Sequence, residues 1–89
     1  MSQIITNPES MISFSRTVME CSERLKKEEY YLFGELNKLG ATWKDPRYQQ
    51  FDRTMTETAR ELASFHTAAH RYSEYLLRKA NAAKKVINS

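Results

Sequence analysis

Two histidines and a glutamate recur at every fourth residue in the second half of the chain, at His66, His70 and Glu74. On a helix this spacing places the three side chains along one face, where imidazole and carboxylate groups can bind a metal ion. The surrounding residues predict neither a preformed pocket nor supporting partners for such ligands. We therefore expect a solvated face, with no bound metal and no cofactor.

The single cysteine, Cys21, is the other residue with reactive chemistry. It has no partner within the chain for a disulfide bond. Because it falls between Val18 and Leu25 on an apolar stripe, we expect a small buried hydrophobe and not a reactive thiolate. The sequence also contains no glycine-rich phosphate loop and no nucleophile at a recognisable spacing from a base. These features predict a protein that is not an enzyme.

The residues above would be positioned by two long helices. Asn7, Pro8 and Glu9 are typical of a helix start, because they supply a capping side chain, a first-turn proline and early negative charge. Apolar residues then recur at steps of three and four, which predicts a helix over about 8–39. This first seam consists of Met11, Phe14, Val18, Cys21, Leu25, Leu32 and Leu39. Gly40 suits the left-handed residue that ends many helices.

A second helix is predicted over about 46–87, after a turn over about 40–45. Asp45 is a favourable cap, and Pro46 fits the first helical position. No glycine or proline interrupts the helix after that point, and ten of twelve seam positions are apolar. This second seam consists of Tyr48, Phe51, Met55, Thr58, Leu62, Phe65, Ala69, Tyr72, Leu76, Lys79, Ala83 and Val86.

The predicted fold is an all-α, two-helix antiparallel hairpin that forms one domain over residues 1–89. Only two glycines and two prolines punctuate the chain, and no useful stretch alternates with the period of two that strands require. A hairpin of this size buries a modest fraction of its surface, so a further stabilising contact is expected. We predict that it assembles into a four-helix bundle dimer.

Apolar residues outside the two seams support assembly with a partner. They cover more of the helix circumference than one neighbouring helix can bury. The partner-interface candidates are Ile12, Met19, Tyr30, Tyr31, Phe33 and Tyr75. The partner would be a second copy, a homologous hairpin or the helical domain of a larger protein.

The only tryptophan, Trp43, lies in the predicted turn. We expect its indole to close the end of the hairpin against Leu39 and Phe51, with one edge partly exposed. Its other interpretation is a recognition group displayed at the tip. A well-buried ring would favour the first interpretation and an exposed ring the second.

The net charge of +3 is concentrated in the second half of the chain, since residues 1–40 carry −1 and residues 41–89 carry +4. Arg71, Arg78 and Lys85 recur every seven residues and form a basic end. This basic end suggests a cytoplasmic adaptor or nucleic-acid-associated protein as an alternative function. However, no aromatic residues are interleaved to stack on bases, and cations also complement a helix carboxyl end. Nucleic acid is therefore the less expected partner.

The tryptophan turn between two long helices resembles the WXG family, the ESAT-like small substrates of type VII secretion systems. Trp43 matches the family tryptophan, and Phe51 matches the aromatic residue that follows it. Asp45 stands where the family has glycine, and Asp45 with Pro46 can start the second helix by capping instead. The family's Tyr-x-x-x-Asp/Glu signal is not matched late in the second helix, because Leu76 and Lys79 follow Tyr72 and Tyr75 at that spacing.

The resemblance implies a secretion-associated helical hairpin that acts by homo- or heterodimerisation, as partner or chaperone of a secreted effector. It also implies synthesis in the cytoplasm and export without a cleaved signal peptide. In agreement, the segment 1–10 has no basic stretch followed by an apolar run, and nowhere do eighteen apolar residues follow one another. We therefore expect neither a signal peptide nor a membrane span.

Overall fold

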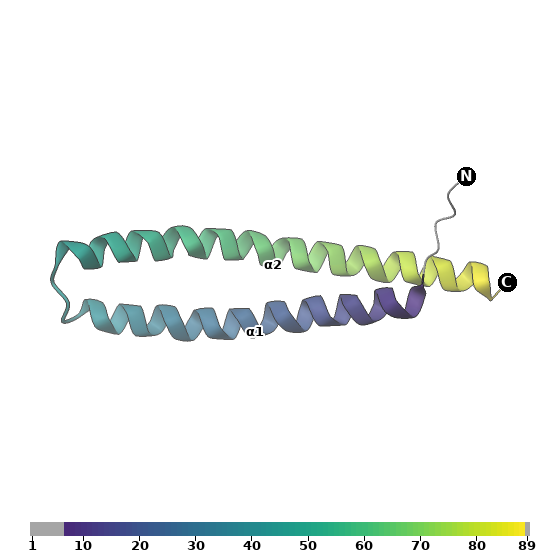
Figure 1. The fold of residues 1–89 in the computed structure, drawn as a ribbon, viewed down its shortest axis with the longest axis horizontal. Helices are drawn as coiled ribbons and strands as arrows, with labels where there is room; N and C mark the ends of the chain where they lie inside the picture. The colour runs from purple at the N-terminus through teal and green to yellow at the C-terminus, as the bar shows by residue number, and fades with distance from the viewer. Residues whose placement is uncertain (1–6, 89) are drawn as a thin grey trace.

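The computed structural model describes residues 7–88 as an antiparallel hairpin of two helices (Figure 1). Helix α1 runs over Pro8–Gly40 and helix α2 over Pro46–Ile87. The part of the chain that the structure describes contains no strand, so the predicted all-α hairpin is confirmed. The molecule is elongated, with extents of 66 × 26 × 13 Å.

Both helices begin at the capping residues expected from the sequence. The side chain of Asn7 accepts a hydrogen bond from the backbone N–H of Ser10 at 3.2 Å. The side chain of Asp45 accepts one from the backbone N–H of Arg47 at 2.8 Å. Each bond satisfies a donor that the first helical turn would otherwise leave unpaired.

The expected left-handed conformation of Gly40 is wrong, because no glycine within residues 7–88 has a positive φ. The reason for glycine here is close packing. A Cβ atom at Gly40 would overlap the hydroxyl of Tyr48. That hydroxyl donates a hydrogen bond to the carbonyl oxygen of Leu36 at 3.4 Å. Gly40 therefore allows the start of α2 to pack closely against the end of α1.

We expect Gly34→Ala and Gly40→Ala to change stability in opposite directions. An added methyl group at Gly34 meets no atom within 4 Å, so alanine should raise the free energy of unfolding by about 1 kcal/mol through helix propensity. At Gly40 the same methyl group displaces the Tyr48 ring, and we expect a loss of about 1 kcal/mol. Urea unfolding followed by far-ultraviolet circular dichroism measures both. Equal effects of the two substitutions would contradict the close packing at Gly40.

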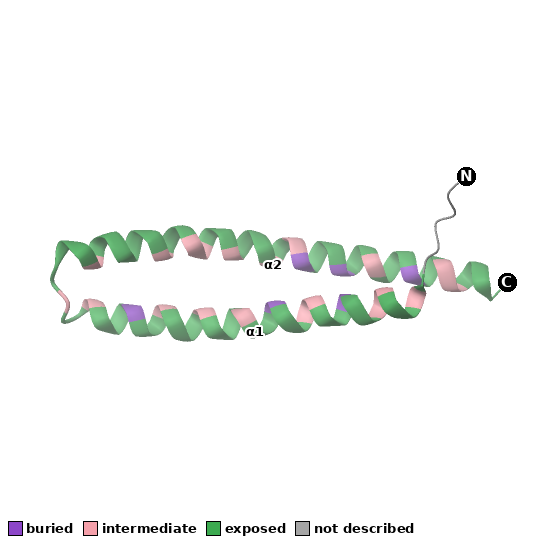
Figure 2. Ribbon diagram, in the orientation of Figure 1, coloured by how far each residue is buried: buried purple, intermediate pink, exposed green. Residues whose placement is uncertain are grey.

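The helices lie closer together at the open end of the hairpin than at the turn (Figure 1). Buried and half-buried residues lie on their facing sides (Figure 2). Small residues occupy this interface near the open end, where Ser15, Ser73 and Ala80 are buried. Larger ones occupy it near the turn, where Leu36 is buried and Phe33 is half-buried. The side-chain sizes account for the taper.

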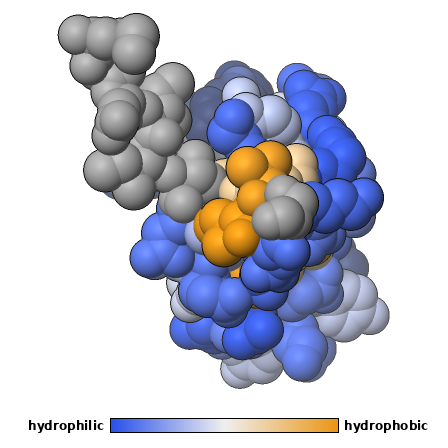
Figure 3. Space-filling model, turned by 90° about the vertical axis from the view of Figure 1, so that its right-hand side faces the viewer, coloured by the Kyte–Doolittle hydropathy of each residue, from blue (hydrophilic) through white to orange (hydrophobic). Residues whose placement is uncertain are grey.

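At the open end, α2 continues past the first residues of α1 (Figure 1). The Lys84 ammonium lies 3.0 Å from the Glu9 carboxylate, which connects the end of α2 to the start of α1. Both side chains are substantially exposed, so this ion pair contributes little to stability. Figure 3 looks at this end of the molecule and shows an apolar patch surrounded by hydrophilic side chains.

Candidate protein-interaction surface

The centre of the hairpin is lined by small and polar residues. Ser15, Ser22 and Ser73 are buried, and Glu29 and His66 are half-buried. We call these five residues the polar interior. In each helix its members are spaced seven residues apart, which keeps them on the side that faces the other helix. The two helices therefore contact one another through hydrogen bonds in addition to apolar groups.

The serine pair in the polar interior forms three hydrogen-bonding contacts. The hydroxyl oxygens of Ser15 and Ser73 lie 2.6 Å apart. Ser15 Oγ also lies 3.1 Å from the backbone carbonyl of Ser73, and Ser73 Oγ lies 3.3 Å from that of Ser15. Such contacts between side chain and opposite backbone require close helix axes, which only small residues allow.

The second part of the polar interior connects both helices through an imidazole ring. His66 Nδ1 lies 2.7 Å from Ser22 Oγ, and His66 Nε2 lies 2.5 Å from Glu29 Oε2. A neutral ring that donates its Nε2–H to Glu29 can accept the Ser22 hydroxyl at Nδ1. Within residues 7–88, no buried side-chain nitrogen or oxygen lacks a hydrogen-bond partner.

The expectation that His66 lies on a solvated face with His70 and Glu74 is wrong for His66. The His66 side chain is only 10% exposed. His70 and Glu74 are exposed, and His70 Nε2 lies 2.8 Å from Glu74 Oε1. A step of four residues turns a helix by about 40°, so two steps carry Glu74 away from the interface that His66 occupies. Within residues 7–88, no three histidine, cysteine or acidic side chains gather as a metal site would require.

Serine, histidine and glutamate are also the residue types of a hydrolytic triad, but this arrangement serves another purpose. A serine nucleophile must reach a substrate, and Ser22 is 1% exposed between the helices. The geometry therefore supports a structural role, in which the trio holds one face of α1 against one face of α2.

The predicted seams are only partly inside the hairpin. In α1, Phe14 is 59% exposed, and Cys21, Leu32 and Leu39 are also exposed. Cys21 is therefore not the buried hydrophobe that its neighbours predicted. In α2, the positions Phe51, Phe65, Tyr72, Lys79 and Val86 are exposed, whereas Tyr48, Met55, Leu62, Ala69, Leu76 and Ala83 are buried or half-buried. In α2 most of one seam column thus faces outward, whereas in α1 the exposed Leu32 and Leu39 share a column with the half-buried Met11, Val18 and Leu25.

Several of the outward apolar residues lie on one side of the hairpin. Each immediately precedes an inward-facing residue, as Phe14 precedes Ser15 and Tyr72 precedes Ser73. One residue turns a helix by about 100°. Because α1 and α2 are antiparallel, the residues one position before the inward-facing ones lie on the same side of the hairpin in both helices. We call this surface the apolar side; it comprises Phe14, Cys21, Leu32, Leu39, Phe65 and Tyr72.

The opposite side of the hairpin is hydrophilic. It is formed by the residues that immediately follow the inward-facing ones, and seven of these are exposed polar or charged residues: Arg16, Glu23, Asn37, Arg60, Thr67, Glu74 and Asn81. Two exposed apolar residues also follow inward-facing ones: Tyr30 follows Glu29 and is 87% exposed, and Leu77 follows Leu76 and is 39% exposed. The hairpin therefore has two unlike sides, and only the apolar side resembles a surface that a partner would cover.

The six interface candidates from the sequence do not share a surface. Ile12, Met19 and Phe33 are half-buried within the single hairpin. Each lies three or four residues from a buried residue of α1, on the flank of the interface with α2. Tyr31 follows Glu29 by two positions and points outward, apart from both sides described above, whereas Tyr75 immediately precedes the half-buried Leu76 and adjoins the apolar side.

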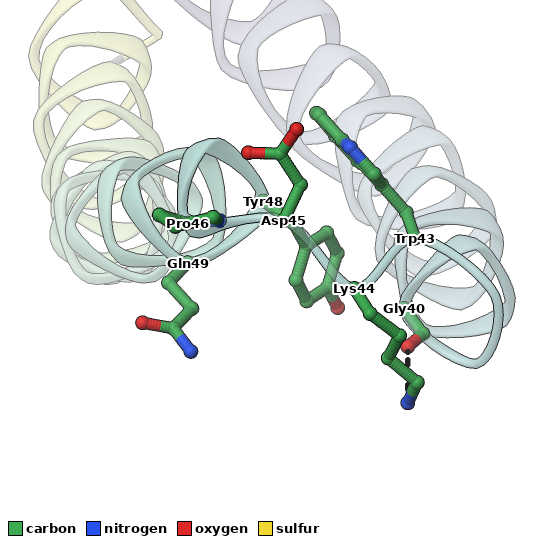
Figure 4. A pocket seen from close by; sticks show the side chains of 7 residues that line it. All are labelled: Gly40, Trp43, Lys44, Asp45, Pro46, Tyr48 and Gln49. Atoms are coloured by element: carbon green, nitrogen blue, oxygen red, sulfur yellow. Dashed lines mark hydrogen bonds between the residues drawn. The ribbon is translucent and has the colours of Figure 1, made fainter.

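At the turn, Trp43 is half-buried and packs edge-to-face on Tyr48, with ring centroids 5.5 Å apart and an interplanar angle of 65° (Figure 4). The expected partial exposure is therefore present. The ring partner is Tyr48, whereas the two expected neighbours, Leu39 and Phe51, are 45% and 49% exposed. Lys44 Nζ donates to the carbonyl oxygen of Gly40 at 3.2 Å and helps to close the end of α1.

The basic end is exposed along α2. Arg71, Arg78 and Lys85 are all exposed. Arg78 lies 3.9 Å from Glu74, so its charge is partly balanced. Arg71 and Arg78 each stand two residues before a buried residue of α2, Ser73 or Ala80. This spacing places both arginines on the outer surface of α2, away from the apolar side. They add positive charge to that surface.

No protein-family model, curated protein or solved structure matches this chain. Over the residues that the structure describes, neither helix is long and apolar enough to cross a membrane. The geometry of the hairpin is therefore the basis for a functional proposal.

Proposed function

We propose that this protein is a non-enzymatic helical hairpin that acts by pairing, through its apolar side, with a second hairpin to form a four-helix bundle. The observation that supports this most is the set of large apolar side chains that stay exposed along one side while polar residues share the interior. Serines and a histidine lie between the helices, while phenylalanine, tyrosine and leucine side chains lie along one outer side. Covering that side would supply the apolar core that the hairpin lacks.

The size of the exposed surface supports the same proposal. The accessible surface is 7424 Å², whereas a compact monomer of this mass exposes about 5,400 Å². The excess of about 2,000 Å² is larger than the roughly 800 Å² that each partner buries in an ordinary interface. Only Leu36, Ala69 and Ala80 are fully buried apolar residues within the hairpin. A partner that covers the apolar side would reduce the exposed area and would increase the number of buried apolar side chains.

The resemblance to the WXG family suggests a more specific role. We propose that the hairpin is a secretion-associated protein, made in the cytoplasm and exported without a cleaved signal peptide, as partner or chaperone of a type VII effector. The turn that contains Trp43 and the paired long helices support this role. The unmatched tyrosine signal in α2 suggests that its partner, and not this chain, carries the export signal.

Light scattering after size-exclusion chromatography tests the pairing. We expect a mass of twice 10.5 kDa for the chain alone, or a stable complex when it is produced together with the products of neighbouring genes. The measurement should be made under reducing conditions, so that a disulfide between two copies of Cys21 does not imitate pairing. A monomer in both experiments would contradict the proposal.

A further inference from the structure

We propose that the outer edge of α2 is a second interaction surface, which binds an acidic helix of a partner protein. Five cations line this edge, and we call them the basic stripe: Arg53, Arg60, Arg71, Arg78 and Lys85. All five residues are exposed. The basic stripe and the apolar side face different directions, so the inference does not depend on pairing and goes beyond the proposed function.

The helical repeat places the five cations in one row. Each of the four arginines stands two positions before a buried or half-buried residue of α2, and Lys85 stands seven positions after Arg78. A step of two residues turns a helix by about 200°, so these side chains lie on the outward surface of α2, toward the hydrophilic side. At about 1.5 Å per residue, the row extends over roughly 48 Å.

The charge of the basic stripe is mostly unbalanced within the hairpin. The carboxylates spaced three or four residues from its members are Glu57 and Glu74. Within residues 7–88, only Arg78 of the five cations forms a salt bridge, to Glu74 at 3.9 Å, and Glu74 also contacts His70. Five cations against two carboxylates leave an excess of three positive charges, which equals the net charge of the whole chain. The row therefore attracts an anionic partner.

The spacing of the cations fits a straight acidic helix. Arg53 and Arg60 are seven residues apart, as are Arg71, Arg78 and Lys85, so neighbouring charges recur about every 10.5 Å. On a partner helix with a heptad repeat, acidic residues recur at the same distance. Arginine also suits carboxylates well, because its guanidinium can form two parallel hydrogen bonds with one of them.

The interruption of the row between Arg60 and Arg71 also suits a helix. The surface of α2 is hollowed there, and the small residues that line the shallow hollow beside Arg71 are Ala63, Ser64, Thr67 and Ala68. The distance between two packed helix axes depends on the size of the side chains at their contact. A partner helix can therefore approach α2 most closely at this point, between two groups of cations.

Nucleic acid fits this row less well than an acidic helix does. On duplex DNA the phosphates follow two curved backbones, separated by grooves about 12 and 6 Å wide, so a straight row of evenly spaced cations meets few of them. A single strand is held by successive aromatic rings on which its bases stack. Only one aromatic residue, Tyr75, lies three or four positions from a member of the basic stripe.

Fluorescence anisotropy of a labelled peptide, titrated with the full chain, tests the inference. The probe is a helical peptide of about four heptads that carries glutamate at every seventh residue on one face. A comparison peptide has the same composition, with its glutamates spread around the helix. The variant Arg60→Gln/Arg71→Gln/Arg78→Gln removes three charges from the basic stripe. Its matched control, Arg16→Gln/Arg24→Gln/Lys27→Gln, removes three exposed charges from α1.

We expect the one-faced peptide to bind the native chain at low salt and to bind the stripe variant about tenfold more weakly. Three exposed ion pairs of ordinary strength together amount to that factor. The α1 variant should bind within about threefold of the native chain. Circular dichroism verifies that both variants are helical.

Equal weakening by the two variants, or equal binding of the two peptides, would show that net charge and not the row is responsible, and would overturn the inference. Absence of binding would overturn it as well, as would tighter binding of a DNA duplex of similar length. Light scattering of the same variants keeps this test separate from the proposed function, because we expect removal of the stripe charges to leave the mass of the pair unchanged.

Discussion

Replacing Phe65 and Tyr72 together by glutamate will abolish pairing while leaving the chain helical. Both rings lie on the apolar side, where a partner would desolvate them, and buried aromatic residues are frequent energetic centres of interfaces. Two losses of about 2 kcal/mol each lower affinity roughly a thousandfold. The charges would add a further penalty, because a carboxylate in an apolar interface has no partner. Light scattering measures the loss directly.

The matched control places the same charges on the other side of α2. Thr67 and Asn81 are exposed on the hydrophilic side, so Thr67→Glu with Asn81→Glu adds equal charge without entering the proposed interface. We expect this variant to pair as the native chain does. If both double variants lost pairing, the added negative charge would be responsible, and not the loss of aromatic rings from the apolar side. If neither did, the apolar side would not be the interface.

Trp43→Ala will lower the free energy of unfolding by about 2 to 3 kcal/mol. Removing a fully buried large aromatic ring typically costs about 3 to 5 kcal/mol, and the indole here is half-buried. The loss includes the edge-to-face contact with Tyr48. Trp43→Phe retains a ring and should lose roughly half as much. Urea unfolding followed by circular dichroism measures each value.

The neighbouring exposed residue provides the comparison for Trp43. Thr42→Ala removes a surface side chain, and we expect a change of less than about 0.5 kcal/mol. Unchanged stability of Trp43→Ala, together with weakened pairing, would show that the indole is a recognition group and not a plug for the turn. Lower stability with unchanged pairing would assign it to the fold alone.

The ends of the helices were predictable from the sequence because their signals are local. A cap such as Asn7 or Asp45 acts on the next two or three residues, and a proline fixes its own φ. These effects do not depend on what packs against the helix. The helix starts therefore agree with the sequence, and only the conformation of Gly40, which depends on Tyr48 across the turn, was misjudged.

The inward faces were not predictable because apolar periodicity identifies a stripe without identifying what covers it. In α2 the aromatic column with Phe65 and Tyr72 is the stronger hydrophobic signal, yet the adjoining column with His66 and Ser73 faces α1. A signal was present in the serines at positions 15 and 22, spaced by one heptad and matched by small residues in α2. Small residues at such a spacing permit close helix approach, and this criterion selects the observed faces.

The taper of the hairpin determines where its structure is weakest. Large side chains pack between the helices near the bend, namely Phe33, Leu36, Trp43 and Tyr48. The serine and alanine side chains near the open end bury less apolar surface, so they stabilise that end less. Fraying should therefore begin at the free ends and advance toward the bend, which unfolds last. The two helices can thus separate at their free ends while the bend keeps them in register for closing again.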